Sequence, residues 1–348
     1  MADNLKDIAN EVGLSVSTIS RVVNGKSYVA PATKRRVMKA LEKHKYAPNQ
    51  IARSLKMQST NTVGIIVPDI RDYFANVIKG ADTIFSEAGY SIILADSNES
   101  DEKEEKYLKL LYEKRIDGLV LATVSQNSKA LQMYFENDIP VVFIDNLPNL
   151  NTSYDAVLLD NVKASMMAVN HIVDCGYNKI AIISGKPAET TAVERVDGYK
   201  HALMNHNLSV DPALIMSGDY TAEDGYRCMM KLLENKAEHE FEAVFATSYK
   251  MTCGAMKAIK EKGLKYPDDI ALVGFDFADE SDLFTPKITS ILQPIDSIGK
   301  LVAERLISQM KDTNRDSKHN FVNTIPRRIL LDPILKMGES CGCTNRNQ

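Results

Sequence analysis

From residue 61 onward, short apolar runs alternate with longer amphipathic stretches, and this alternation continues through most of the chain. Apolar runs of four to six residues between turn-forming residues are typical of buried strands, and helical spacing fills most of the gaps. We predict strands at residues 63–67, 92–95, 119–122, 141–144, 180–184, 243–246 and 270–275. This pattern predicts parallel sheets covered by helices on both faces, and it is long enough for two lobes.

The segments that follow these strands are the candidates for ligand contact. Ligands in such folds bind beyond the carboxyl ends of the strands. These segments are residues 68–74, 96–98, 145–146, 184–195, 247–250 and 276–279. A cleft between two lobes would bring them together.

The charge of the 348-residue chain is distributed unevenly. Residues 1–57 carry 11 Lys and Arg against 4 Asp and Glu, whereas the rest of the chain carries 31 against 42, although the net charge is only -4. A small basic head on an acidic body is expected of a protein that contacts nucleic-acid phosphates at one end. A solvated basic helix would give the same local charge.

The head has the pattern of two short helices joined by a tight turn. Gly13 can adopt the positive φ of a sharp turn, and Ser15 is placed to cap the second helix. The expected inward residues are Leu5, Ile8, Ala9, Val12, Val16, Ile19, Val22 and Val23. An arbitrary pair of packed helices is the alternative to a helix-turn-helix.

The outward side of the second helix then presents Ser17, Thr18, Ser20 and Arg21. Their hydroxyls can reach bases or phosphates, and the Arg21 guanidinium can make a forked contact to guanine. A third helix should start at Pro31, with Val37, Met38 and Leu41 at helical spacing. Its cations Lys34, Arg35 and Arg36 either neutralise phosphates or form a solvated face.

Three motifs of the head resemble the lactose/galactose repressor (LacI/GalR) family. They read Lys6-Asp7-Ile8-Ala9, then Val16-Ser17-Thr18-Ile19-Ser20-Arg21-Val22-Val23-Asn24-Gly25, then Tyr46-x-Pro48-Asn49-x-x-Ala52-Arg53-x-Leu55. The resemblance implies a transcription regulator, expected to be a repressor, that binds a palindromic double-stranded operator as a homodimer. The DNA-binding residues it implies are Ser15, Val16, Ser17, Thr18, Ser20, Arg21, Asn24, Asn49, Ala52, Arg53, Leu55 and Lys56.

In proteins that this chain resembles, the segment from Asn49 to Lys56 is a hinge helix, and a leucine at the position of Leu55 enters the minor groove. Eight residues are too few for a stable isolated helix, so its order must come from a second copy and from DNA. An apolar wedge there would bend the duplex. A plain linker with an incidental leucine is the alternative.

The resemblance covers nearly the whole chain and implies a body similar to periplasmic sugar-binding proteins, with three crossings between the lobes. The implied effector-binding residues are Phe74, Asp96, Arg195, Ser248, Tyr249 and Asp276. A guanidinium and a carboxylate suit hydroxyl-rich or anionic ligands. Arg195 and Asp276 could instead form a salt bridge between lobes, and Phe74 could belong to the core.

The chain departs from the family pattern at the cleft. Ser248-Tyr249 stands where relatives usually have Asn-Asp, and Phe277 replaces a usual second Asp. A simple neutral hexose is therefore in doubt, and these changes allow a more apolar or a larger effector, with a sugar or sugar derivative as the expected class. Its binding should change the angle between the lobes and thereby shift the population that can bind DNA.

Other classes of protein find little support in the sequence. It contains no dinucleotide fingerprint, phosphate loop, nucleophile elbow or HExxH motif, so we expect no enzyme and no cofactor. A solute-binding sensor or a sugar-modifying enzyme remains the alternative. The start of the chain lacks the features of a secretory signal and no segment reads as a membrane span, so we expect a cytoplasmic protein.

The five cysteines are scattered, so free thiols and no metal site are expected. Cys341 and Cys343 could bind metal or respond to oxidation, but a free tail is the preferred interpretation. The predicted division is a helix-turn-helix domain at 1–48, a hinge helix and linker at 49–60, a two-lobed effector and dimerisation domain at 61–340, and a flexible tail at 341–348.

Overall fold

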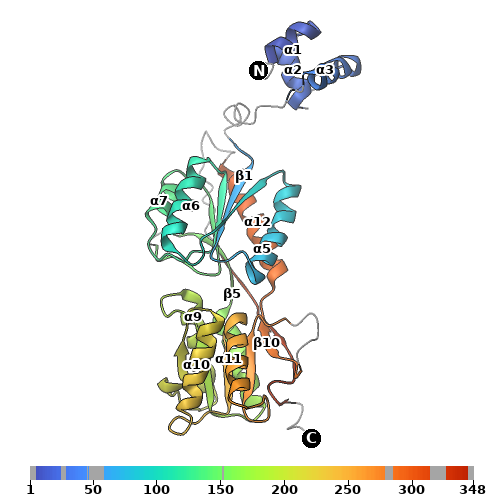
Figure 1. Ribbon diagram of the computed structural model, residues 1–348. Coiled ribbons are helices and arrows are strands. Elements are labelled where there is room, and N and C mark those ends of the chain that lie inside the picture. Colours follow the sequence, from blue (N-terminus) through green and yellow to red (C-terminus); the bar gives the residue numbers. More distant parts are fainter. Residues whose placement is uncertain are drawn as a thin grey trace. The chain divides into compact units, whose positions relative to one another are not determined.

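The structure is a computed structural model of the chain (Figure 1). It describes residues 5–24, 29–44, 46, 59–150, 153–278, 285–313 and 327–343. The chain forms two compact units, Met1–Thr60 and Asn61–Gln348, here called the head and the body.

The head contains three helices, α1 (Leu5–Val12), α2 (Val16–Asn24) and α3 (Pro31–Lys43). Gly13 has a φ of 67°, as predicted for the turn between α1 and α2. The Ser15 hydroxyl accepts a hydrogen bond of 3.2 Å from the Thr18 amide, which confirms its role as the cap of α2. The helix-turn-helix prediction is therefore confirmed at the level of its elements.

The core of the head contains most of the expected inward residues. Ile8, Ile19 and Val37 have no exposed surface. Val16 is 40% exposed, so the prediction that it faces inward is wrong. Val16 is the first residue of α2, and at this end of the helix its side chain is not covered by α1 or α3. Met38, which was grouped with Val37 and Leu41 by helical spacing, is 53% exposed. Met38 follows Val37 on α3, and one residue of α-helix rotates the side chain by about 100° away from the buried face.

The first lobe of the body is a six-stranded parallel sheet in the order β11-β5-β4-β3-β1-β2. Helices α5 and α12 pack on one face, and α6 and α7 pack on the other (Figure 1). Its elements are β1 (Thr62–Val67), α5 (Asp72–Glu87), β2 (Ser91–Asp96), α6 (Asp101–Glu113), β3 (Gly118–Leu121), α7 (Lys129–Glu136), β4 (Val141–Ile144), β5 (Asp155–Leu159), α12 (Ile295–Thr313) and β11 (Arg328–Leu331).

The second lobe is also six-stranded, in the order β12-β10-β9-β8-β6-β7, and only the β10–β12 pair is antiparallel. Helices α8 and α9 cover one face, and α10 and α11 cover the other. Its elements are α8 (Asn161–Asp174), β6 (Ile180–Ser184), α9 (Thr190–Asn205), the 3-10 turn η1 (Pro212–Leu214), β7 (Ile215–Ser217), α10 (Ala222–Glu234), β8 (Ala243–Ala246), α11 (Tyr249–Glu261), β9 (Ala271–Phe275), β10 (Thr289–Leu292) and β12 (Ile334–Lys336).

The chain passes between the lobes three times, as expected: after β5, after β10, and between β11 and β12. All seven predicted strands are present within one residue of the expected ends. The sequence analysis missed β5, β7, β10, β11 and β12.

Helix pairs approach closely where glycines replace larger residues. On α9, a Cβ on Gly198 would lie 2.3 Å from the carbonyl oxygen of Val162 on α8. On the opposite face, a Cβ on Gly254 of α11 would lie 2.1 Å from the carbonyl oxygen of Ala222 on α10. Backbone therefore packs on backbone in both pairs, and this fixes where the ends of these helices lie.

The end of the described chain is built into the second lobe. Cys341 has no exposed surface, and Cys175 forms a disulfide with Cys343. The expectation of a free tail from residue 341 is wrong for residues 341–343, and the expectation of free thiols is wrong for Cys175 and Cys343. The two cysteines are 168 residues apart in the sequence, so no local pattern could pair them.

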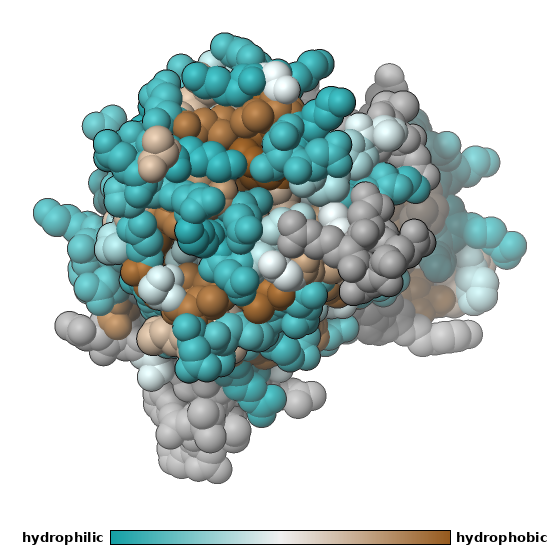
Figure 2. Space-filling view, turned by 90° about the horizontal axis from the view of Figure 1, so that it is seen from below, coloured by the Kyte–Doolittle hydropathy of each residue, from teal (hydrophilic) through white to brown (hydrophobic). Residues whose placement is uncertain are grey.

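Figure 2 shows a mainly hydrophilic face over the second lobe, with small hydrophobic areas between polar side chains. Among the described helices, none is long and apolar enough to cross a membrane.

Candidate functional site

A cleft of about 460 Å³ lies between the two lobes of the body. This volume falls within the range of small-molecule sites in proteins. The lining is mixed, with charged, aromatic and amide side chains from both lobes. It comprises Pro68, Asp69, Arg71, Asp72, Tyr73, Phe74, Asn76, Glu99, Val124, Asp145, Asn146, Glu189, Thr191, Arg195, Tyr220, Ser248, Tyr249, Lys250, Asp276, Ala278, Gln293 and Ile295.

Strand topology explains why the cleft lies there. In the first lobe, β1 pairs with both β2 and β3, and in the second lobe β6 pairs with both β7 and β8. The connections that leave such neighbouring strands run to opposite sides of the sheet and leave a crevice at the carboxyl ends. Segments after β1, β4, β6, β8 and β9 all contribute lining residues.

Arg195 of α9 is a firmly held polar group of the cleft. It is only 4% exposed. Its Nε donates to Asn161 Oδ1 at 2.8 Å and its Nη1 donates to the Thr247 carbonyl at 2.7 Å, while the guanidinium stacks 3.9 Å from the ring centre of Phe275. Within the described part of the chain no hydrogen bond engages Nη2, so this amine is available to a ligand.

Two half-buried carboxyl groups lie near Arg195. Asp276 accepts hydrogen bonds from the backbone amide and the side-chain amide of Gln293, at 3.2 and 2.7 Å. Burial raises the pKa of Asp276, although Gln293 and Arg195 act against this shift. Burial also raises the pKa of Asp145 to about 7, with Arg195 lowering it and Glu189 adding to the rise. Asp145 can therefore change charge near neutral pH.

Aromatic rings supply the apolar part of the lining. Phe74 is buried and meets the Tyr73 ring edge-on, with 4.9 Å between ring centres. On the second lobe, the Tyr220 hydroxyl bonds the Thr191 hydroxyl at 3.1 Å. Burial raises the pKa of Tyr220 to about 12, so this phenol is neutral and can donate. A ligand with a ring and several hydroxyls would find both an apolar surface and polar partners.

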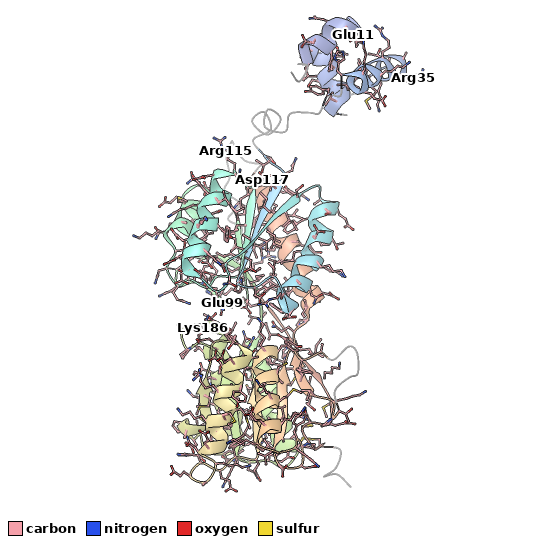
Figure 3. All side chains as sticks on the ribbon, in the orientation of Figure 1. Glu11, Arg35, Glu99, Arg115, Asp117 and Lys186 are labelled. Carbon is pink, nitrogen blue, oxygen red and sulfur yellow. A yellow bond between two sulfur atoms is a disulfide. The ribbon has the colours of Figure 1, made fainter. Side chains whose placement is uncertain are left out.

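Direct contacts join the two lobes around the cleft. Lys250 pairs with Asp69 at 2.7 Å, and Lys186 pairs with Glu99 at 2.9 Å. Figure 3 shows Glu99 and Lys186 on facing sides of the two lobes. Asn146 on the first lobe accepts a hydrogen bond of 3.1 Å from the Thr191 hydroxyl on the second. The lobe angle is thus held by ion pairs and amide hydrogen bonds.

Backbone strain is concentrated at the same place. Asp72, Glu99, Asp145, Tyr220 and Asp276 all line the cleft and all have φ between 49° and 63°. Residues other than glycine rarely adopt a positive φ, and this backbone conformation persists only where the surrounding structure enforces it. The strain points to a site whose side chains are aimed at a ligand.

The exposed face of α2 in the head carries the other candidate contacts. Ser15, Val16, Ser17 and Arg21 are exposed, and Thr18 and Ser20 are half-buried. The Ser15 hydroxyl lies 2.8 Å from that of Ser17. Four hydroxyl-bearing side chains, one valine and one arginine therefore lie on and beside this short helix.

Comparisons with known proteins decide the family. The model of the bacterial regulatory proteins of the lacI family matches residues 4–49, and the model of periplasmic binding proteins and the sugar-binding domain of the LacI family matches residues 60–331. The chain belongs to the LacI family. Its members are DNA-binding transcription regulators controlled by effectors that bind in the sugar-binding domain, and this chain is such a regulator.

Individual relatives agree with this assignment. The HTH-type transcriptional repressor PurR of Histophilus somni (strain 129Pt) is 35% identical over 334 residues, which covers 95% of this chain and 98% of the relative. The regulator CelR in its complex with cellobiose has 27% identity and a TM-score of 0.72, with 97% and 99% of the two chains covered. The lac repressor dimer bound to operator and the anti-inducer ONPF has 22% identity and a TM-score of 0.83, with 98% and 99% covered, and this likeness concerns the fold.

Five of the six expected effector contacts of this LacI-family chain line the cleft: Phe74, Arg195, Ser248, Tyr249 and Asp276. Asp96 does not. Its carboxylate accepts hydrogen bonds from the Asn98 and Ile70 amides, at 2.7 and 3.4 Å, and so it ties together the loops after β1 and β2. The Ser248 hydroxyl also caps α11 by accepting the Met251 amide. Phe277 packs against Tyr249 and lies outside the lining.

Sequence reasoning missed several lining residues. Tyr220 follows β7 and Gln293 follows β10, and neither strand was predicted. Asp145, Glu189 and Lys250 lie in segments that the carboxyl-end rule selected, but they were not singled out.

The expected DNA contacts are only partly within the described residues. Asn24 is the last residue of α2. Asn49, Ala52, Arg53, Leu55 and Lys56 lie outside the described residues. On α3, Arg36 donates to the Val12 carbonyl at 2.7 Å and so caps the end of α1. This contact favours a structural role for Arg36 over a phosphate contact.

Proposed function

We propose that this LacI-family regulator binds a palindromic operator as a homodimer and that a sugar or sugar derivative in the interlobe cleft controls its affinity for DNA. The observation that carries the effector proposal is Arg195, a buried guanidinium with one amine left for a ligand. Asp276 supplies a carboxylate nearby, and Phe74 supplies an apolar face for a sugar ring. The cellobiose complex of CelR supports a sugar of one or two rings.

Exposed apolar surface supports the homodimer. Strand β2 is an edge strand of the first lobe, and Ile93 and Leu94 on it are 37% and 41% exposed. A second copy that packs against this edge would cover them. A two-fold axis in the dimer then requires two related half-sites about one helical turn apart.

The proposed division of labour follows the predicted boundaries. Residues 1–48 read the half-site, 49–60 form the hinge, and the body from residue 61 binds the effector and its partner subunit. Leu55 of the proposed hinge inserts into the minor groove, so Leu55→Ala should weaken operator binding without changing the melting temperature of the body. Unaltered operator affinity would remove the wedge role.

Selection of bound duplexes from a random pool tests the DNA proposal. The full-length protein should return a sequence with two-fold symmetry, and an Arg21→Gln variant should lose preference at one position of each half-site. Recovery of no symmetric sequence would count against a palindromic operator and against the dimer together.

A thermal-shift screen tests the effector proposal. Sugars, sugar acids and phosphosugars would be compared for a rise in melting temperature, because a ligand of the native state stabilises it by mass action. The rise should disappear in Arg195→Met and persist in Arg227→Met, which removes an exposed guanidinium outside the cleft. An undiminished rise in Arg195→Met would show that the ligand binds elsewhere.

A further inference from the structure

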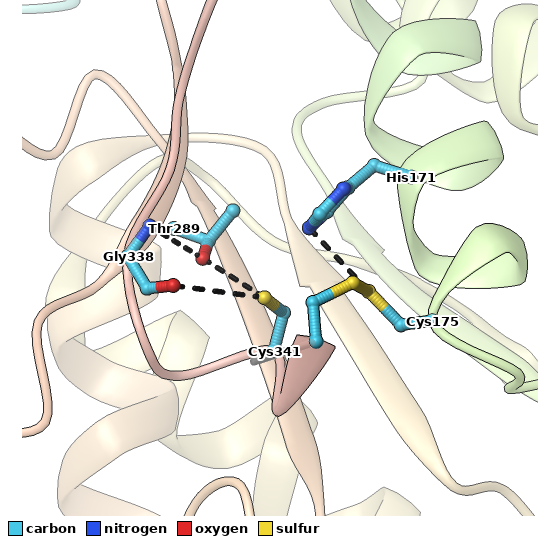
Figure 4. Close-up of a disulfide and its surroundings, with 6 residues drawn as sticks. His171, Cys175, Thr289, Gly338 and Cys341 are labelled. Carbon is cyan, nitrogen blue, oxygen red and sulfur yellow. Dashed lines mark hydrogen bonds between the residues drawn. A yellow bond between two sulfur atoms is a disulfide. The ribbon is translucent and has the colours of Figure 1, made fainter. Parts of the chain in front are cut away.

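Four potential metal ligands meet in the second lobe, and they come from two segments that are far apart in the sequence. They are His171, Cys175, Cys341 and Cys343, and their ligand atoms all lie within 4.8 Å of one another. His171 and Cys175 are one turn apart on and just after α8, whereas Cys341 and Cys343 come from the end of the described chain. Figure 4 shows the two segments facing each other.

We propose that, with the Cys175–Cys343 disulfide reduced, these four residues bind one Zn²⁺ ion in a Cys3His site. Three thiolates and one imidazole form a common tetrahedral structural site for zinc. Zinc bonds of about 2.3 Å to sulfur and about 2.0 Å to nitrogen place tetrahedral ligand atoms roughly 3.5 to 3.8 Å apart. His171 Nε2 and Cys175 Sγ are 3.6 Å apart, which matches that spacing.

The site is built and buried. Cys341 is 0% exposed, Cys175 is 4% exposed and His171 is 8% exposed, while Cys343 is half-buried. A group of soft ligands that is shielded from water and converges from two segments is typical of a closed structural site. Gly342 has a φ of 70°, and this turn lets the cysteines on both sides of it face the same point.

Contacts other than the disulfide hold the terminal segment in position. The Ser340 hydroxyl accepts from the Thr289 amide at 2.9 Å and donates to the Leu272 carbonyl at 2.6 Å. The Leu272 amide donates to the Ser340 carbonyl at 2.8 Å. The backbone and hydroxyl contacts of Ser340 therefore hold Cys341 and Cys343 next to α8. We expect the sulfur atoms to stay near His171 when the disulfide is reduced.

A neighbouring hydroxyl suits a thiolate ligand. The Thr289 hydroxyl donates a hydrogen bond of 3.1 Å to Cys341 Sγ, and the Thr289 oxygen in turn accepts from the Gly338 amide (Figure 4). Such a donor stabilises a sulfur that carries negative charge and fixes its direction.

Zinc can bind only after the disulfide has been reduced. A dithiol or phosphine reductant supplies two electrons, which break the Cys175–Cys343 bond and, with two protons, leave two thiols. Zinc then displaces one proton from each of the three thiols, Cys175, Cys341 and Cys343, and His171 binds through neutral Nε2. The disulfide and the zinc site use the same sulfur atoms and exclude each other. Zinc would thus tie the end of the chain to α8 in a reduced protein as the disulfide does in an oxidised one.

Metal titration of the full-length protein tests the proposal. Protein treated with a phosphine reductant and freed of metal would be titrated with Zn²⁺ in competition with a chromophoric chelator. We expect one tightly bound zinc per chain and a rise in melting temperature. Cobalt(II) in place of zinc should give the intense visible bands of a tetrahedral site together with thiolate charge-transfer absorption.

Variants locate the ion. Cys343→Ser and His171→Gln should weaken zinc binding by at least about tenfold, because loss of even an outer partner of a ligand costs that much. Cys253→Ser changes a half-buried free cysteine outside the cluster and should bind like the wild type. Cys343 is half-buried, so its serine variant should fold even if replacement of buried Cys341 does not.

Several results would overturn the proposal. These are no zinc uptake by the reduced protein, an octahedral cobalt spectrum, or equal affinity in Cys343→Ser and Cys253→Ser. Equal uptake by the oxidised protein would also overturn it, because two of the four ligands are then consumed. A disulfide that survives the reductant would do the same, since the thiols would never become available.

Discussion

At the scale of single residues, the cleft depends on how Arg195 is held. Its guanidinium bonds Asn161 at the start of α8 and the Thr247 carbonyl at the end of β8, and it stacks on Phe275 at the end of β9. A buried charge is costly unless its donors are satisfied and opposite charges lie near. The arrangement therefore fixes three elements around one amine that is left for a ligand.

Asp145 gives a pH dependence with a defined sign. Its pKa is raised to about 7 in the folded protein, above its value of about 3.8 in the unfolded chain. Between these values the unfolded chain has lost the proton and the folded protein retains it, so this group makes folding less favourable as pH rises, up to about 7. Asp145→Asn removes the effect and should raise the melting temperature.

The comparison needs two pH values. Thermal unfolding of Asp145→Asn and of wild type should differ most at about pH 8, where the full penalty applies, and less at about pH 5, where the wild-type group is penalised only in part. Other titrating groups are common to both proteins and cancel in the difference. A difference that grows toward acid pH would contradict the raised pKa.

Sequence alone could place some cleft residues and not others. The strand-end rule selected the segments that contain Arg195 and Asp276, because β6 and β9 are wholly buried strands with clear ends. The family resemblance singled out the two residues within those segments. Tyr220 could not be expected, because β7 is a three-residue edge strand without a buried residue. Asp96 has the right position after β2, but its carboxylate turns toward the loop amides of Ile70 and Asn98.

At the scale of elements, helix α3 carries two neighbouring arginines with different tasks. Arg35 is exposed (Figure 3), whereas Arg36 donates to the Val12 carbonyl at the end of α1. On the proposal that Arg35 contacts a phosphate, Arg35→Gln should reduce the slope of log affinity against log salt by about 1. Fluorescence anisotropy with an operator duplex at several salt concentrations measures this slope.

Arg36→Gln should act on the head itself. Loss of the donor to the Val12 carbonyl should cost about 1 kcal/mol and accelerate hydrogen exchange in α1, with the salt slope unchanged. Each arginine serves as the control for the other. Identical salt slopes and identical exchange in the two variants would contradict this assignment.

The crossing of α8 and α9 allows a second test at this scale. Ala at Gly198 would place its Cβ 2.3 Å from the Val162 carbonyl, so the helices must separate. We expect Gly198→Ala to lower the free energy of unfolding by about 1–3 kcal/mol, although alanine is the better helix former. Urea unfolding measures this loss.

A matched change on the exposed face of α9, His201→Ala, should leave the free energy of unfolding within about 0.5 kcal/mol of wild type. Since α8 also positions Asn161 against Arg195, Gly198→Ala should weaken effector binding as well. A Gly198→Ala protein as stable as wild type would mean that the helices can shift apart without cost.

Two of the strands that sequence reasoning missed, β11 and β12, share a physical cause. Strands β11 and β12 pair at the sheet edges, and neither contains a wholly buried residue. Their assignment depends on partners such as β5, about 170 residues earlier in the chain. The Cys175–Cys343 pair depends on contacts of the same sequence range. Hydrophobic periodicity in the sequence indicates local burial, but it does not show which distant segment a strand or a cysteine will pair with.

At the scale of the whole body, three chain crossings and a few polar contacts connect two separately packed lobes. The lobes have their own hydrophobic cores, whereas the contacts around the cleft are ion pairs such as Asp69–Lys250 and Glu99–Lys186. Polar contacts of this kind exchange readily with water. We therefore expect the angle between the lobes to change more easily than the packing inside either lobe. A ligand that bonds both lobes shifts that angle by its differential affinity.

The Asp69–Lys250 pair allows this coupling to be measured. Burial would raise the pKa of Asp69, but hydrogen bonds from Arg71 and Lys250 outweigh it and lower the pKa below its usual value. Lys250→Met removes one link between the lobes. A partly exposed pair contributes at most about 1 kcal/mol, so effector affinity should fall by no more than about fivefold if the ligand prefers the linked lobes.

Lys179→Met is the matched control, because Lys179 pairs with Glu240 at 2.5 Å within the second lobe and outside the cleft. Calorimetric titration with the ligand returned by the thermal-shift screen should show a change only for Lys250→Met. Equal changes in both variants would mean that net charge and not the interlobe link sets the affinity. A loss of a hundredfold or more would instead make Lys250 a direct ligand contact, since that exceeds what an ion pair of this exposure can contribute.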